Sequence, residues 1–80
     1  MHLNALQTAA HIRALLADRG IPQAALADYL GIRQQAVSRR LTGAVPFDVD
    51  ELARTAQFLG LHVAELIGPW EHTPAHAEAV

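Results

Sequence analysis

Apolar residues recur every three or four positions along most of the chain, which is the spacing of one face of an amphipathic helix. The first such stretch runs from about residue 5 to residue 19. Its predicted inner stripe consists of Leu6, Ala9, Ile12, Leu15 and Leu16. Asn4 and Gln7 form a capping-box pattern at its start, and Gly20 can take the left-handed conformation that ends a helix. The pattern therefore predicts a first helix of about four turns.

Two shorter helical stretches follow, separated by Gly31. Pro22 suits the start of the first, where its missing N–H costs nothing. That stretch is only about two turns long and would be unstable alone, so it must pack against the rest of the chain. The second stretch has a narrow inner side and a broad polar side that is nearly free of acid. The predicted polar side consists of Gln34, Gln35, Ser38, Arg39 and Thr42, and the predicted inner side of Ala36, Val37 and Leu41.

A fourth helix is predicted where Asp48 and Glu51 form a second capping-box pattern. We expect Leu52, Ala56 and Leu59 along its inner stripe, Val49 and Ala53 beside them, and Gly60 at its end. A short fifth helix is expected over about residues 63–67. No stretch alternates as a strand would. The sequence predicts an all-α, five-helix domain over residues 1–68 and a C-terminal tail over residues 69–80.

Composition narrows the class of protein. Eighty residues, 51% of them hydrophobic, are enough for one small domain. The absence of cysteine excludes disulfides and thiolate metal sites, and the apolar runs are far shorter than the roughly 20 residues that span a bilayer. We expect a cytoplasmic protein that does not enter a membrane. His72 and His76 have metal-like spacing but no third ligand, and no catalytic constellation is visible, so we expect no metal, no cofactor and no enzymatic activity.

The charges are unevenly placed. The net charge of −2 argues mildly against a nucleic-acid partner, but distribution matters more than the sum. Between Pro22 and Gly43 the cations are Arg33, Arg39 and Arg40, and Asp28 is the only acid. Every cation in the chain is arginine, the side chain suited to bidentate contact with guanine and phosphate. A GC-rich genome that favours arginine codons explains the same bias equally well.

The segment 23–39 resembles the helix-turn-helix of the Cro/phage-repressor (XRE-type) family. Ala27 is small where the second and third helices would cross, and Gly31 permits the turn between them. The anchors of the pair in this resemblance are Leu26, Leu30, Ile32 and Val37. The wider pattern, over roughly residues 8–68, resembles the lambda-repressor-like domain of that family. The resemblance implies a five-helix fold with the helix-turn-helix at the second and third helices.

The resemblance also implies how the chain would meet double-stranded DNA. The third helix would enter the major groove, where glutamine can pair with adenine and arginine with guanine. The expected base-reading residues are Gln34, Gln35, Ser38 and Arg39, and the expected phosphate contacts are Gln23, Arg33, Arg40 and Thr42. Arg40 falls on the inner side of its helix, so its stem would pack while its guanidinium reaches a phosphate or a carboxylate.

Physical chemistry alone supports one part of this interpretation. The second helix begins without an acid, so its N–H groups and positive dipole end are free for an anion. The fourth helix begins with Asp48, Asp50 and Glu51, which neutralise that end. Elsewhere, Arg13 and Arg54 are expected on the solvated surface, and Tyr29 partly buried.

Three functions remain open. The first is a transcriptional repressor or regulator, expected to bind a pseudo-palindromic operator as a homodimer with recognition helices about 34 Å apart, in the cytoplasm of a bacterium or of a phage host. The second is an antitoxin whose tail, residues 69–80, binds a small protein partner. The third is a helical protein-interaction module without DNA binding, supported only by the net charge. Trp70 either folds back on the first and fifth helices or meets a partner subunit as a dimer contact.

Overall fold

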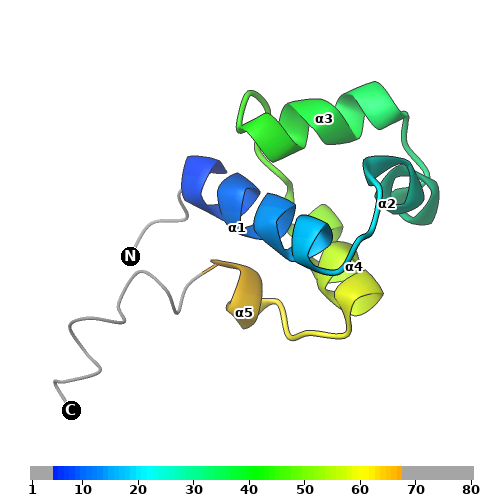
Figure 1. Ribbon diagram of the computed structural model, residues 1–80. Helices are drawn as coiled ribbons and strands as arrows, with labels where there is room; N and C mark the ends of the chain where they lie inside the picture. The colour runs from blue at the N-terminus through cyan, green and yellow to red at the C-terminus, as the bar shows by residue number, and fades with distance from the viewer. Residues whose placement is uncertain (1–4, 68–80) are drawn as a thin grey trace, which may run out of the picture.

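A computed structural model describes residues 5–67, which form five helices and no strand (Figure 1). The helices are α1 (Ala5–Asp18), α2 (Gln23–Leu30), α3 (Gln34–Thr42), α4 (Val49–Leu59) and α5 (Ala64–Ile67). The prediction of an all-α fold with five helices is confirmed over these residues. Asn4, Trp70, His72, His76 and the predicted tail 69–80 lie outside the described residues.

The turn between α2 and α3 depends on Gly31. Its φ of 73° lies in the left-handed region, which a residue without a Cβ enters at little cost. Its N–H donates to the carbonyls of Ala27 at 2.8 Å and Asp28 at 3.2 Å, and the N–H of Ile32 donates to Ala27 as well. The chain therefore leaves α2 abruptly and starts α3 at Gln34 in a new direction, as the helix-turn-helix interpretation predicted.

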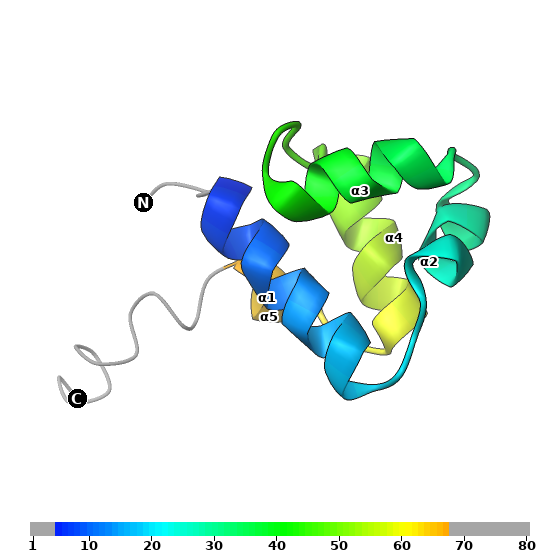
Figure 2. The same cartoon turned by 45° about the horizontal axis from the view of Figure 1, so that its top comes forward.

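The core lies between α1, α2, α4 and the inner side of α3 (Figures 1 and 2). Figure 2 shows α3 running across the outside of the bundle, with α1 and α4 beneath it. Every helix contributes buried apolar side chains, among them Ile12, Leu26, Val37, Leu41, Leu52 and Leu66. Because none of these short helices is stable alone, this shared burial is what holds α2 and α3 in their relative positions.

Two details of the predicted stripes are wrong. Leu6 is 64% exposed and lies against the backbone of Gly43, because the buried arc of α1 is centred on Ile12 and includes Thr8 instead. Val49 is 80% exposed, and Ala53 is exposed too, because the buried arc of α4 extends toward Thr55 and Leu59. In both helices the buried side was predicted in the wrong direction because a threonine, Thr8 in α1 and Thr55 in α4, was counted as polar although it is buried.

The described part of the chain contains no helix long and apolar enough to cross a membrane. Over the same residues, no three histidine or carboxylate side chains gather as a metal site would require.

Candidate nucleic-acid interface

One side of α3 is fixed in the core and the other is open to solvent. Val37 and Leu41 are 0% and 1% exposed and attach the helix to the bundle. Gln34, Gln35, Arg39 and Thr42 are exposed on the opposite side, and Ser38 is half-buried beside them. The predicted placement of these polar side chains outside the bundle is therefore confirmed for all but Ser38, which is partly covered. Their contacts with DNA stay predictions.

An open groove of about 440 Å³ runs along one flank of α3. Its lining residues are Arg33, Gln35, Ala36, Arg39, Arg40 and Val45. The loop side of the groove is held in place because the N–H of Val45 donates to the carbonyl of Arg39 at 3.2 Å. The groove thus brings together four of the eight residues predicted to meet DNA, three of them arginines.

The other predicted residues lie outside this groove. Gln34 and Ser38 follow the outer side of α3, and Gln23 begins α2, where it is half-buried. The hydroxyl of Thr42 donates to the carbonyl of Arg39 at 3.0 Å and accepts from the N–H of Ala44 at 3.5 Å. Thr42 is therefore engaged in ending its own helix, in addition to any contact with phosphate.

Three arginines outside α3 are bound to the carboxyl ends of helices. Arg13 donates to the carbonyl of Leu41 at the end of α3, and Arg19 to that of Leu59 at the end of α4. Arg54 donates to two carbonyls at the end of α2. Arg13 is exposed, as expected, and Arg54 is half-buried. Both also bind helix ends, because the last carbonyls of a helix have no partner within the helix and attract a cation. Sequence spacing gave no sign of these contacts between distant segments.

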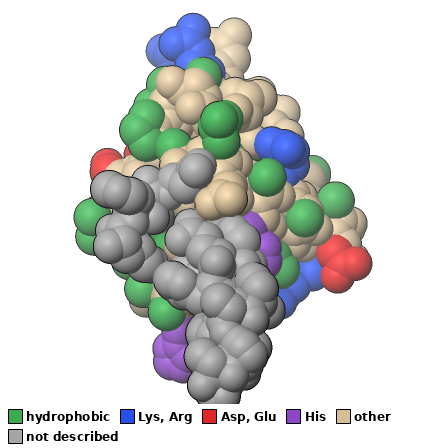
Figure 3. Space-filling view, turned by 90° about the vertical axis from the view of Figure 1, so that its left-hand side faces the viewer, with side chains coloured by type: hydrophobic (Ala, Val, Ile, Leu, Met, Phe, Trp, Pro, Cys, Tyr) green, Lys and Arg blue, Asp and Glu red, His purple; other side chains and the backbone are tan. Residues whose placement is uncertain are grey.

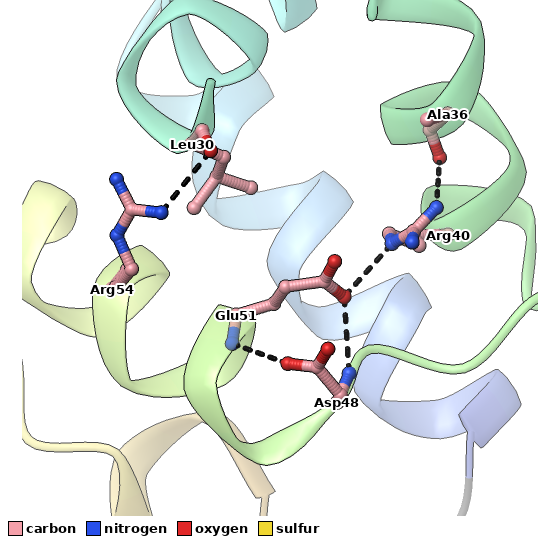
Figure 4. A network of polar contacts seen from close by, with 6 residues as sticks. All are labelled: Leu30, Ala36, Arg40, Asp48, Glu51 and Arg54. Carbon is pink, nitrogen blue, oxygen red and sulfur yellow. Dashed lines mark hydrogen bonds and ion pairs between the residues drawn. The ribbon is translucent and has the colours of Figure 1, made fainter. Parts of the chain in front are cut away.

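Arg40 is bound inside the protein as well (Figure 4). Its Nε donates to Oε1 of Glu51 at 2.8 Å, and its Nη1 donates to the carbonyl of Ala36 at 3.0 Å. The hydrogen bond to Glu51 raises the pKa of Arg40 above its ordinary value, against the opposing effect of burial. Of the two partners expected for this guanidinium, a carboxylate or a phosphate, the structure supplies the carboxylate. A phosphate contact by Arg40 stays a prediction.

Arg33 and Arg39 are different from the other four arginines. Within residues 5–67, neither side chain has an intramolecular hydrogen bond or ion pair. Both are exposed and both line the groove beside α3. In Figure 3, one group of arginine side-chain atoms projects at the top of the molecule, at the height of α3 in Figure 1, and other arginine atoms lie lower on the right, one group beside an acidic side chain. The cations that remain available for a ligand are thus concentrated at α3.

The N-termini of α2 and α3 are uncapped by side chains, whereas that of α4 is capped. At α2 the N-cap is Pro22, with no side-chain cap and no acid in the first turn. At α3 the N-cap is Arg33, again with no side-chain cap and no acid. At α4, Asp48 accepts from the N–H of Glu51 at 2.7 Å, and Glu51 accepts from the N–H of Asp48 at 3.0 Å, which is the predicted capping box (Figure 4). The N–H groups that begin α2 and α3 are therefore open to an anion.

A family model described as helix-turn-helix matches residues 12–66, which is most of the chain. The chain belongs to the helix-turn-helix family. The match is to the XRE type that the residues of segment 23–39 indicated, and α2, the turn at Gly31 and α3 form the unit that gives the family its name. Membership of this family supports a DNA-binding regulator.

Two solved structures resemble this helix-turn-helix protein. The clp gene regulator ClgR from C. glutamicum is similar with a TM-score of 0.74 and 24% identity, over 82% of this chain and 86% of that one. A transcriptional regulator from Listeria innocua is similar with a TM-score of 0.72 and 25% identity, over 79% of this chain and 59% of that one. No curated protein sequence matches the chain. The structural likenesses confirm the fold.

Proposed function

We propose that this chain is a sequence-specific regulator of transcription, of Cro/repressor type, that reads an operator half-site with α3 in the major groove of double-stranded DNA. The observation that carries the proposal is the placement of the unbound cations. Four arginines are bound within the protein, whereas Arg33, the N-cap of α3, and Arg39, in α3, have no hydrogen bond or ion pair within residues 5–67 and lie beside the exposed glutamines of that helix. The two structural relatives are a gene regulator and a transcriptional regulator, which supports the same class.

In this proposal α3 reads bases through Gln34, Gln35, Ser38 and Arg39. Gln35 and Arg39 line the same groove, so they would face neighbouring base pairs, with glutamine suited to adenine and arginine to guanine. Each good bidentate pair contributes about 1–3 kcal/mol of discrimination against the wrong base.

Phosphates would be held at the two sides of α3. Gln23 and the acid-free start of α2 would take one phosphate. Arg33, Arg40 and Thr42 would contact others, with Arg40 the weakest because Glu51 already holds its Nε. Such contacts fix the position of the protein on the duplex and carry no sequence information.

A single half-site gives limited specificity, so we propose a homodimer on a pseudo-palindromic operator. The two copies of α3 would then lie about 34 Å apart, one turn of DNA, on the same side of the duplex. Trp70 is the proposed dimer contact.

The test is DNA binding measured against salt and sequence. The preferred sequence would first be selected from random duplexes, and affinity then compared for the parent, Gln35→Ala and Arg39→Ala. We expect steep salt dependence for the parent and a loss of about tenfold or more for each variant on the preferred site, with a smaller loss on random DNA. Equal losses on both duplexes would make these residues phosphate contacts. Absence of binding at low salt would refute the proposal and leave a protein-interaction module.

A further inference from the structure

We propose that Arg54 is a positioning residue for DNA recognition, which fixes the orientation of α3 by holding the turn between α2 and α3. The inference rests on the proposed function. Arg54 belongs to α4, and its Nη2 donates to the carbonyl of Tyr29 at 2.8 Å while its Nη1 donates to the carbonyl of Leu30 at 3.1 Å. The guanidinium also lies 5.8 Å from the centroid of the Tyr29 ring. Figure 4 shows the side chain extending from α4 toward Leu30.

These two carbonyls are the ones that the turn leaves open. The last four carbonyls of a helix lack partners within the helix, and the N–H groups of Gly31 and Ile32 donate to Ala27 and Asp28. The carbonyls of Tyr29 and Leu30 remain, and Arg54 binds both. A planar guanidinium can reach two adjacent acceptors in fixed geometry, whereas a lysine ammonium acts as a point charge. The chemistry of the contact therefore calls for arginine.

The same side of α4 also holds the far end of α3. Glu51 and Arg54 are three residues apart, so they lie on one side of α4. Glu51 binds Arg40 in the second half of α3, and Arg54 binds the residues just before the turn that begins α3. Figure 4 shows both side chains extending from α4 toward the helix-turn-helix. Two polar contacts from α4 thus hold the second half of α3 and the end of α2, and the Arg54 contact acts at the turn from which Gln34 and Gln35 follow.

The chain offers a matched control. Arg19 makes the same kind of contact, from its Nη1 to the carbonyl of Leu59, but at the carboxyl end of α4 and away from the turn at Gly31. Loss of either contact should destabilise the domain in a similar way. Only loss of the Arg54 contact should release the recognition helix.

The experiment compares Arg54→Met, which keeps an unbranched stem without donors, with Arg54→Lys and Arg19→Met. Affinity is measured on the preferred duplex and on random DNA, at a temperature where circular dichroism shows each variant folded. We expect Arg54→Met to lose about tenfold on the preferred duplex and less on random DNA, Arg54→Lys to lose an intermediate amount, and Arg19→Met to bind as the parent does. If Arg54→Met does not fold, Arg54→Lys decides the comparison.

A second measurement does not depend on DNA. Amide hydrogen exchange over residues 31–34 should be faster in both Arg54 variants than in the parent and unchanged in Arg19→Met. The proposal is overturned if the Arg54 variants match Arg19→Met in both measurements. If the parent binds no duplex, the proposed function fails, and unchanged exchange at the turn would overturn the Arg54 contact independently. Faster exchange at the turn would then support Arg54 as the residue that holds it.

Discussion

The N-termini of α3 and α4 differ in whether side chains of the protein cap the first N–H groups of the helix. At α4, Asp48 and Glu51 bind each other's backbone, and Asp50 adds a further negative charge in the first turn. At α3, Arg33 provides no side-chain cap, and Gln34 and Gln35 provide no charge. Capping is worth about 1 kcal/mol, so the second arrangement gives up stability that the first one keeps.

The difference indicates which end is available to a ligand. The acids at α4 already occupy the place that a phosphate would take. At α3 the first N–H groups lie beside Arg33 and the exposed amides of Gln34 and Gln35, and Arg39 lines the same groove in the last turn; neither arginine has a hydrogen bond or ion pair within residues 5–67. The start of α3 is thus poorly capped for helix stability but carries the groups best suited to contact DNA. Local sequence that disfavours its own helix is expected at functional sites.

Among substitutions at the two helix N-termini, Glu51→Ala is expected to have the largest effect on stability. The substitution removes one half of the capping box and the partner of Arg40. The free energy of unfolding, measured by urea denaturation, should fall by about 1–3 kcal/mol because Arg40 loses a charge-assisted hydrogen bond. Binding to random DNA should be kept or should strengthen, because a negative charge beside the groove is gone.

Glu51→Gln is the control for this variant, since its amide oxygen can still accept both hydrogen bonds. It should lose less stability than Glu51→Ala. Equal stability of parent and alanine variant would mean that the contact between α3 and α4 does not hold the helices together.

Gln34→Glu is expected to have a smaller effect, which raises the stability of the domain and lowers its affinity for DNA. A carboxylate at the start of α3 should stabilise the helix by up to about 1 kcal/mol through the helix dipole. The same carboxylate should weaken binding to DNA by about tenfold, since it repels phosphate and replaces an amide proposed to read a base. Thermal melts and fluorescence anisotropy of a labelled duplex measure the two effects.

The smallest effect is expected from the reverse change at α4. Asp50→Asn removes a negative charge from a helix start that faces no DNA in the proposal, so stability should fall by about 0.3 kcal/mol and affinity for DNA should not change. A loss of affinity equal to that of Gln34→Glu would remove the distinction between the two helix ends.

The sequence predicted the helices and the turn well because their signals are local. Gly31 and the Asp48–Glu51 pair act on their immediate neighbours, and the structure places them as predicted. The stripes of α1 and α4 were less accurate, because Thr8 and Thr55 are buried although neither hydroxyl has a partner in the described part of the chain. No periodicity argument anticipates a buried polar side chain of this kind.

The candidate site was predictable only in part. The outer side of α3 follows from the 3.6-residue period and was placed correctly, apart from the partial burial of Ser38. The roles of Arg13, Arg19 and Arg54 join segments that are 28, 40 and about 25 residues apart. Such contacts depend on the packing of whole helices, so spacing along the chain does not reveal them. They matter because they decide which arginines are left for DNA.

The most direct test of this account is an amide NMR titration of the chain with its selected duplex. The account predicts that the largest shift changes occur at the backbone amides of residues 23–25 and 34–39, where helices α2 and α3 begin. It predicts no change at residues 49–52, where α4 begins and its own acids fill the helix end. Shifts concentrated at 49–52, with α3 unaffected, would contradict it.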